Sequence, residues 1–130
     1  MYLSRLHISK FRVFNDITLY FKNGINILIG ENNSGKTAII DALRICLGCG
    51  KPDNYIYIQE SDLHINPQDP NENNTTIQFD LIFEFGTAEI ERECFYDFIS
   101  QDEEDPTKQT IQLHLKFIQE NNSKKKYFKR

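Results

Sequence analysis

The stretch Gly30-Glu31-Asn32-Asn33-Ser34-Gly35-Lys36-Thr37 decides how the rest of this sequence is interpreted. It fits the phosphate-loop (Walker A) pattern Gly-x4-Gly-Lys-Thr, whose four fixed positions coincide by chance with a probability on the order of 10⁻³–10⁻² over a chain of this length. A nearly apolar run at 25–29 precedes the motif, and apolar residues at helical spacing follow it. Because a phosphate cradle requires this order of strand, loop and helix, the motif predicts a nucleotide-binding site.

The chemistry of the predicted site follows from the residue types in the motif. Gly30 and Gly35 allow the backbone to curl closely around an anion and to present successive N–H groups to phosphates. The helix that begins at Lys36 or Thr37 directs the positive end of its dipole to the same place. We expect Lys36 to bridge the β- and γ-phosphates and the Thr37 hydroxyl to ligate Mg²⁺, so ATP and Mg²⁺ are the predicted cofactors.

Alternating apolar residues predict strands before the motif. The run 2–8 is expected to form one strand, with Tyr2, Leu6 and Ile8 on one side, and the run 17–21 another. Residues 25–29 are apolar except at one position, which is typical of a strand covered on both faces in a parallel sheet.

After the motif, a helix is expected to end at Gly48, and one-sided strands are expected at 77–85 and 111–117. A short helix at 90–99 lies between these strands, and residues 124–130 begin a returning strand. We therefore predict an α/β fold: the N-terminal lobe of a P-loop NTPase with a mixed sheet, plus an antiparallel β subdomain.

Composition narrows the class of protein. The 130 residues contain 15 Lys and Arg against 19 Asp and Glu, and the resulting charge of −4 excludes a uniformly basic nucleic-acid coat. The longest apolar runs are too short to span a bilayer, and the N-terminus does not match a secretory signal. Three cysteines are too few for a disulfide framework. We therefore expect a cytoplasmic protein with no membrane partner.

Three stretches resemble the N-terminal lobe of ABC-type ATPase heads. They are Ile8-Ser9-Lys10-Phe11-Arg12, residues 25–37 and Ile40-Asp41-Ala42-Leu43. This superfamily includes SMC proteins, RecF-like repair ATPases and the overcoming-lysogenization-defect (OLD) nucleases. SMC and RecF-like loops usually have Gly at the position of Asn33. The sequence at 32–37, followed by Ser61-Asp62-Leu63-His64, is most similar to the OLD family.

The resemblance implies roles for residues in and around the motif. Arg12 would approach the nucleotide phosphates from a neighbouring loop, and Asn32 would lie near the γ-phosphate. The phosphate cradle would be formed by Asn33, Ser34, Gly35, Lys36 and Thr37. The residues alone leave a second interpretation of Arg12 open, that of a surface arginine paired with Asp16.

Three other polar residues in the resembling stretches have bland interpretations. Asp41 is expected on the helix surface or in packing of the lobe. His64 is expected to be a loop residue rather than a metal ligand or base. Asp62 matches the family's Asp-Leu-His segment, but the sequence alone does not indicate what it does.

The motifs that ABC-type heads need for hydrolysis are absent from these 130 residues. There is no apolar strand ending in Asp-Glu (Walker B), no Ser-Gly-Gly signature and no Toprim nuclease domain. Asp80 and Glu84 lie within an alternating strand and do not substitute for Walker B. We therefore interpret residues 1–130 as a single partial ATPase domain. Its strands, phosphate loop and first helix occupy 1–50, and a largely antiparallel portion with a short helix occupies 51–130.

The resemblance then predicts the function of a larger parent protein. The chain would be the ATP-binding N-terminal portion of an OLD-like ATP-dependent DNA endonuclease, acting in DNA processing or anti-phage defence. That parent would bind DNA and form a homo-oligomer, whereas the chain alone would bind ATP weakly and hydrolyse it negligibly. One alternative is a fragment of a RecF- or SMC-like DNA repair or segregation ATPase. A second alternative is a non-catalytic module that binds nucleotide or a partner.

Two weaker signals favour structural explanations. Cys46 and Cys49 form a lone CxxC pair without two further ligands at metal spacing, and Cys46 falls on the apolar side of the helix. The last seven residues carry five positive charges that could contact DNA, although a solvated hairpin end is favoured.

Overall fold

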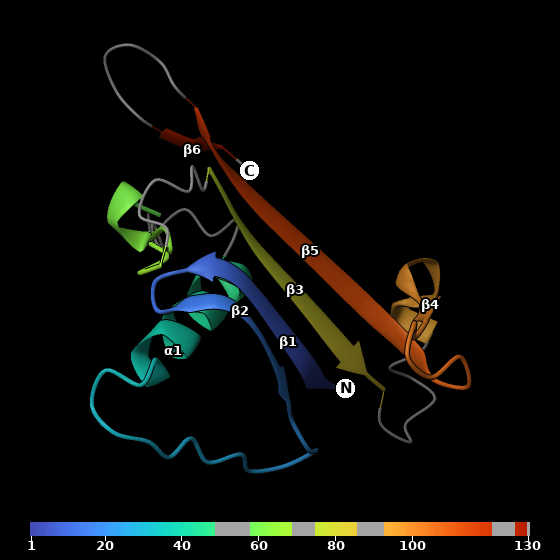
Figure 1. Ribbon diagram of the computed structural model, residues 1–130. Helices are drawn as coiled ribbons and strands as arrows, with labels where there is room; N and C mark the ends of the chain where they lie inside the picture. Colours follow the sequence, from blue (N-terminus) through green and yellow to red (C-terminus); the bar gives the residue numbers. More distant parts are fainter. Residues whose placement is uncertain (49–57, 69–74, 86–92, 121–126, 130) are drawn as a thin grey trace.

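The structure, a computed structural model, describes residues 1–48, 58–68, 75–85, 93–120 and 127–129. One long α-helix lies beside a single twisted sheet (Figure 1). The elements in chain order are β1 (Tyr2–Phe11), β2 (Phe14–Tyr20), α1 (Lys36–Leu47), the 3₁₀ helix η1 (Glu60–Asp62), β3 (Thr76–Glu84), the 3₁₀ helix η2 (Tyr96–Phe98), β4 (Ser100–Gln101), β5 (Gln109–Glu120) and β6 (Tyr127–Lys129).

The strands lie in the order β2-β1-β3-β5-β4, and β6 pairs with the other end of β5. Each strand pair among the described residues is antiparallel. The predicted antiparallel portion is thus confirmed, including a strand within the expected return at 124–130. The predicted mixed sheet is wrong for the described residues, because its expected parallel member at 25–29 pairs with none of the other strands.

The core lies between the sheet and one face of α1. Leu6 of β1 is opposite Leu19 of β2 and Leu81 of β3, and these positions share the face of the sheet toward the helix. Phe79 lies at the centre, with ring centroids 5.1 Å from Phe11 and 6.0 Å from Phe117 in edge-on geometry. The helix contributes buried side chains at helical spacing: Ala38, Ile39, Ala42, Ile45 and Cys46. The burial of Cys46 confirms its interpretation as a core residue.

An irregularity in β1 corrects the expected side of Tyr2. The register between β1 and β3 shifts between Leu3 and Arg5, which inserts one extra residue into β1. Because a one-residue slip turns the following side chains to the other face, Tyr2 lies opposite Glu84 and donates a hydrogen bond to its Oε2 at 2.7 Å. Tyr2 therefore belongs to the polar face, not to the side occupied by Leu6.

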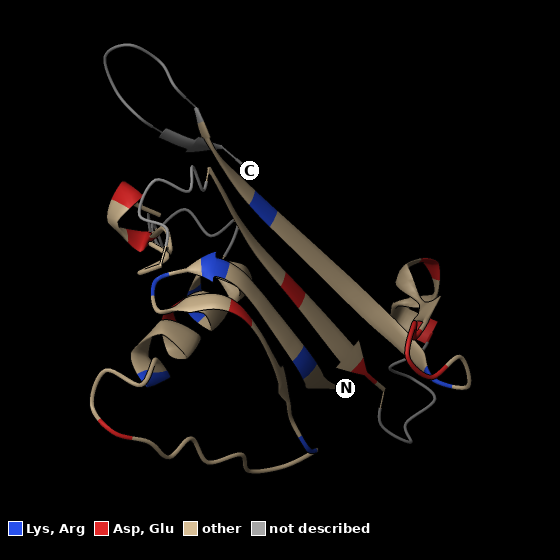
Figure 2. Ribbon diagram, in the orientation of Figure 1, with Lys and Arg blue, Asp and Glu red and all other residues tan. Residues whose placement is uncertain are grey.

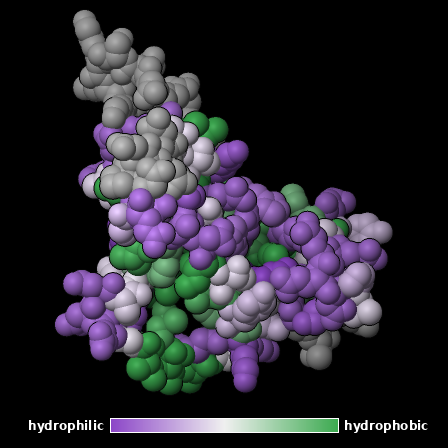
Figure 3. All heavy atoms as spheres, in the orientation of Figure 1, coloured by the Kyte–Doolittle hydropathy of each residue, from purple (hydrophilic) through white to green (hydrophobic). Residues whose placement is uncertain are grey.

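The segment 25–29 differs most from its prediction. It forms no regular structure, and Ile25 and Ile29 are 92% and 91% exposed. The loop swings away from the sheet in Figure 1, and Figure 3 shows a hydrophobic area at the same lower edge of the molecule. A buried parallel strand needs neighbours on its edges and faces, and the described residues supply none here.

The predicted short helix is also corrected in part. Residues 86–92 lie outside the described part of the chain, and the remainder of the predicted helix contains η2. Phe98, expected on the buried face of the helix, is exposed. None of the described helices is long and apolar enough to cross a membrane.

Candidate nucleotide-binding site

The phosphate loop connects the exposed segment 25–29 to the first turn of α1. Gly35 is the N-cap of this helix with φ +96°, and its carbonyl accepts the first helical hydrogen bond from Ile39 N–H at 3.0 Å. A Cβ atom at this position would lie 2.3 Å from Cζ of Phe14 on β2. Glycine is therefore required here twice, by the backbone conformation and by the close approach of the β1–β2 hairpin.

Asn33 occupies a left-handed conformation with φ +68°. Asparagine tolerates this region better than most residues with a side chain, because its short polar group can bond locally. This explains how the loop forms without the glycine that SMC and RecF-like loops usually have at this position.

The Lys36 side chain folds back over the loop. Its Nζ donates hydrogen bonds to the carbonyl oxygens of Gly30 and Glu31, each at 2.5 Å, and lies 3.3 Å from Oγ of Ser34. A Cβ at Gly30 would be 2.6 Å from the same serine oxygen, so the loop closes tightly here. These contacts hold the ammonium group inside the loop, beside the first turn of the helix.

A cavity of about 630 Å³ lies at the N-terminus of α1. Its volume falls within the usual range for small-molecule sites. Six of the eight predicted nucleotide-site residues line it, and the other two, Gly30 and Ser34, contact Lys36. The lining residues are Arg12, Val13, Asn32, Asn33, Gly35, Lys36, Thr37 and Ala38. The arrangement presents an ammonium, a guanidinium, two amides and a hydroxyl around a helix N-terminus, which suits a phosphate chain.

Arg12 reaches this cavity from the two-residue turn between β1 and β2. Its Nη1 donates to Oδ2 of Asp41 at 2.5 Å, and its Nε donates to Oδ1 of Asp62 at 2.8 Å. Burial alone would lower the pKa of Arg12, but the two carboxylates outweigh it and raise the pKa, so the guanidinium stays charged. The alternative pairing of Arg12 with Asp16 is wrong, because Asp16 instead contacts Nε2 of His7 at 3.1 Å.

Asp62 and His64 join the same network. The backbone N–H of Arg12 donates to the carbonyl of Asp62 at 2.7 Å. Nδ1 of His64 lies 2.8 Å from the carbonyl oxygen of Arg12, and since a carbonyl only accepts, this ring nitrogen is the donor. Asp62 also accepts a hydrogen bond from the N–H of Gln59, which caps η1. Sequence reasoning missed these roles because fifty residues separate Arg12 from Asp62 and no local pattern links them.

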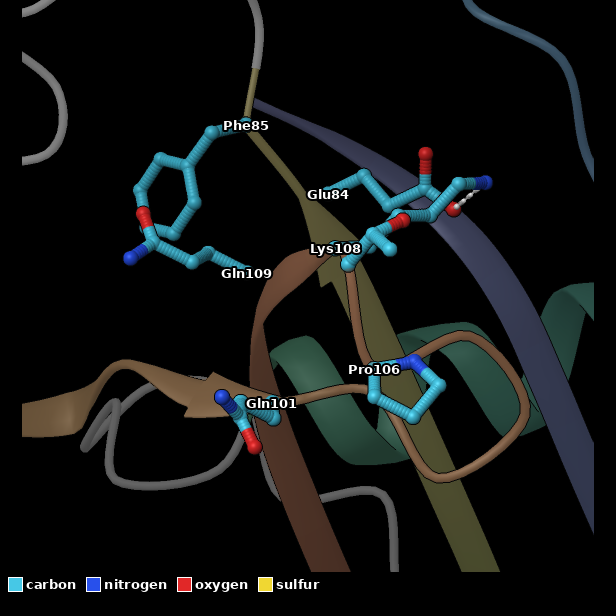
Figure 4. A pocket seen from close by; sticks show the side chains of 7 residues that line it. Glu84, Phe85, Gln101, Pro106, Lys108 and Gln109 are labelled. Carbon is cyan, nitrogen blue, oxygen red and sulfur yellow. Dashed lines mark hydrogen bonds and ion pairs between the residues drawn. The ribbon is translucent and has the colours of Figure 1, made fainter.

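A second cavity, of about 430 Å³, lies at the far end of the sheet and is shown in Figure 4. Lys108 on its wall pairs with Glu84 at 3.1 Å, and Gln101 and Pro106 lie across from them. Because its cation is already paired, this cavity suits an anionic ligand less well than the phosphate loop does. No group of three or more His, Cys, Asp or Glu side chains in the described part of the chain is arranged to hold a metal ion.

A family model described as "AAA domain" matches residues 5–130. The chain belongs to this AAA domain family. The match covers nearly the whole sequence, including the phosphate loop, β1 and the antiparallel strands.

Curated relatives of this AAA domain are named as DNA repair proteins. The chain is 42% identical over 45 residues to the DNA replication and repair protein RecF of Limosilactobacillus reuteri, covering 35% of this chain and 12% of that protein. It is 49% identical over 51 residues to RecF of Psychromonas ingrahamii, covering 39% and 14%. It is 40% identical over 47 residues to the DNA double-strand break repair Rad50 ATPase of Thermoplasma volcanium, covering 36% and 5%. The aligned part is thus a small fraction of each relative.

These relatives support an ATPase of the ABC/SMC/RecF-like P-loop group. They do not extend to the OLD nucleases in particular, so the finer assignment made from the sequence is not shown.

Proposed function

We propose that this chain is the nucleotide-binding N-terminal part of a RecF- or Rad50-like ATPase that acts in DNA repair, and that it binds Mg-ATP at residues 30–37. The observation that carries the proposal is the cavity at the N-terminus of α1, which the phosphate-loop residues and Arg12 line together. The names of the relatives favour this alternative over the OLD-like endonuclease.

The residues present fit a nucleoside triphosphate with its magnesium ion. Gly35 keeps the backbone low enough for N–H groups to approach phosphate oxygens, and Lys36 exchanges its contacts with loop carbonyls for contacts with phosphate. The Thr37 hydroxyl is exposed beside them and suits Mg²⁺, which prefers oxygen ligands. The bound metal supplies neutralisation of phosphate charge, and the chain's own residues bind and orient the phosphates.

The remaining functions belong to the proposed larger protein. The chain matches at most 14% of the RecF relatives quoted above, and its own sequence lacks Walker B and signature motifs. We propose that another part of that protein supplies these motifs and that the isolated chain binds ATP with negligible hydrolysis. DNA binding and homo-oligomerisation are likewise proposed for the larger protein.

Calorimetric titration of Mg-ATP into the 130-residue chain tests the proposal, with Lys36→Ala as the loss variant. Lys116→Ala is the matched control, because it removes an exposed lysine on β5, outside the phosphate-loop cavity. We expect the wild type and Lys116→Ala to bind with similar affinity and Lys36→Ala to bind at least about tenfold more weakly, a loss of about 1.4 kcal/mol. Equal binding by Lys36→Ala, or no binding by a folded wild type, would refute the proposal.

A further inference from the structure

The guanidinium of Arg12 is held from three directions. Asp41 on α1 binds Nη1, Asp62 of η1 binds Nε, and the Phe11 ring lies under the group with its centroid 4.9 Å from Cζ. Arg12 nevertheless remains 31% exposed and lines the phosphate cavity. An arginine that only neutralised these two carboxylates would not need to border an anion site.

The backbone around Arg12 is fixed by the same short segment that holds its side chain. Arg12 has φ +51°, an uncommon conformation for a residue with a side chain. The Arg12 N–H bonds to Asp62, Phe11 forms an isolated antiparallel bridge with Leu63, and the His64 N–H donates to the carbonyl of Lys10 at 3.0 Å. The turn therefore has one position relative to α1, set by contacts on both its main chain and its side chain.

One edge of the guanidinium is left over. Arginine has three nitrogens in a rigid planar fork, and the contacts in the described part of the chain engage Nε and Nη1 of Arg12 but not Nη2. An immobilised arginine can bind an anion without losing further rotamer entropy, because the neighbouring carboxylates have already fixed its side chain.

We propose that Asp41 and Asp62 are positioning residues, which hold Arg12 so that Nη2 is available to a phosphate oxygen of a nucleoside triphosphate. This inference rests on the proposed nucleotide site and adds two residues to it. Its sign is opposite to that of simple electrostatics. Removal of a carboxylate beside a triphosphate should strengthen binding through charge alone, whereas loss of a positioning contact weakens it.

Asp41 offers the cleaner test of the two. Besides Arg12 it contacts Arg44 at 3.6 Å, and alanine is the best helix former, so Asp41→Ala preserves α1. Asp62 also caps η1, so its replacement disturbs a second feature. Mg-ATP is titrated calorimetrically into the full chain carrying Asp41→Ala, Asp41→Asn, Arg12→Ala or the double change Arg12→Ala with Asp41→Ala. Melting temperatures are measured in parallel.

We expect Asp41→Ala to weaken Mg-ATP binding about three- to tenfold, which is the size of one hydrogen bond to a charged group. Asp41→Asn should recover most of this loss, because its amide oxygen still accepts from Nη1. In the Arg12→Ala background, Asp41→Ala should have no further effect, since its role passes through the arginine. A purely structural aspartate would not give this pattern.

Unchanged or tighter binding by Asp41→Ala would overturn the inference, as would an equal loss in the Arg12→Ala background. If Asp41→Ala fails to fold, the pair Asp62→Ala and Asp62→Asn gives the same comparison with the same expected order. Failure of the proposed function is distinguishable, because it appears as a wild type that does not bind or as a Lys36→Ala variant that binds equally. The first of those results would overturn both proposals together.

Discussion

A buried ion pair connects the acidic loop after β4 to the first strand, and its removal should destabilise the whole fold. Arg5 and Asp102 are 8% and 7% exposed, and Nη2 of Arg5 lies 2.8 Å from Oδ2 of Asp102. Oδ1 of Asp102 also accepts the backbone N–H groups of Glu104 at 2.8 Å and Asp105 at 2.9 Å. Figure 2 shows acidic residues gathered at this end of the sheet, near β4.

The expected cost follows from what each substitution leaves unpaired. Removing one partner of a buried ion pair costs about 3–5 kcal/mol, because the other charge stays buried without compensation. Asp102→Ala removes both the charge and the acceptor of two backbone N–H groups, so we expect a loss of about 3–5 kcal/mol. Asp102→Asn keeps an acceptor oxygen and should lose only about 1–3 kcal/mol. For comparison, a domain of this size is usually stable by about 5–15 kcal/mol.

Urea unfolding followed by far-UV circular dichroism measures this loss. With a slope of about 2 kcal/mol per molar urea, Asp102→Ala should lower the midpoint by about 1.5–2.5 M. Glu103→Ala is the matched control, because it removes an exposed carboxylate from the same loop and should cost less than about 0.5 kcal/mol. Arg5→Met and the double variant complete a cycle whose coupling energy should be at least about 1.5 kcal/mol. Strict additivity, or a midpoint for Asp102→Ala equal to that of Glu103→Ala, would refute the reasoning.

Two further predictions concern the loop and the polar face of the sheet. Gly35→Ala should lower stability by more than about 1–2 kcal/mol, because it adds a steric conflict with Phe14 to an unfavourable φ, and thermal unfolding that matches the wild type would contradict this. His7 contacts Asp80 at 2.7 Å and Asp16 at 3.1 Å, and since carboxylates only accept, both bonds require the protonated ring. Burial alone would lower the pKa of His7, but these hydrogen bonds outweigh it and raise the pKa. The stabilisation should therefore be complete below the unfolded pKa of about 6.5 and disappear as pH rises through the higher folded pKa. The difference in urea midpoint between wild type and His7→Gln should shrink from about pH 5.5 to about pH 8.5, and a constant difference would show that the ring does not act through its charge.

Local patterns predicted the elements whose stability depends on their own periodicity. The alternation at 77–85 and 111–117 gives β3 and β5, and the apolar spacing after the phosphate loop gives the buried face of α1. Gly48 ends the helix as expected, with its N–H donating to Arg44. These features could be read from the sequence because each side chain's partner lies at a fixed spacing in the chain or across a neighbouring strand.

The arrangement around Arg12 could not be read in the same way. Sequence proximity suggested Asp16 as its partner, but the sharp turn after Phe11 directs the arginine away from that strand residue and toward α1 and η1. Asp41 and Asp62 come from two elements with no shared periodicity, so only the tertiary fold brings them together. The site's predicted motif and its unpredicted support therefore depend on different scales of structure.

The segment 25–29 shows why a pattern can be clear while its predicted structure does not form. Burial of a large aliphatic side chain is worth about 1.5–3 kcal/mol, so leaving Ile25, Ile27 and Ile29 in water forgoes much of what such a run can contribute. A parallel strand realises that energy only when other strands and helices cover it, and the antiparallel sheet described here lies elsewhere. If the chain is part of a RecF- or Rad50-like ATPase, as we propose, the neighbours of 25–29 come from the rest of that protein. The same packing would then fix the start of the phosphate loop, so that covering this strand and ordering the nucleotide site are one event.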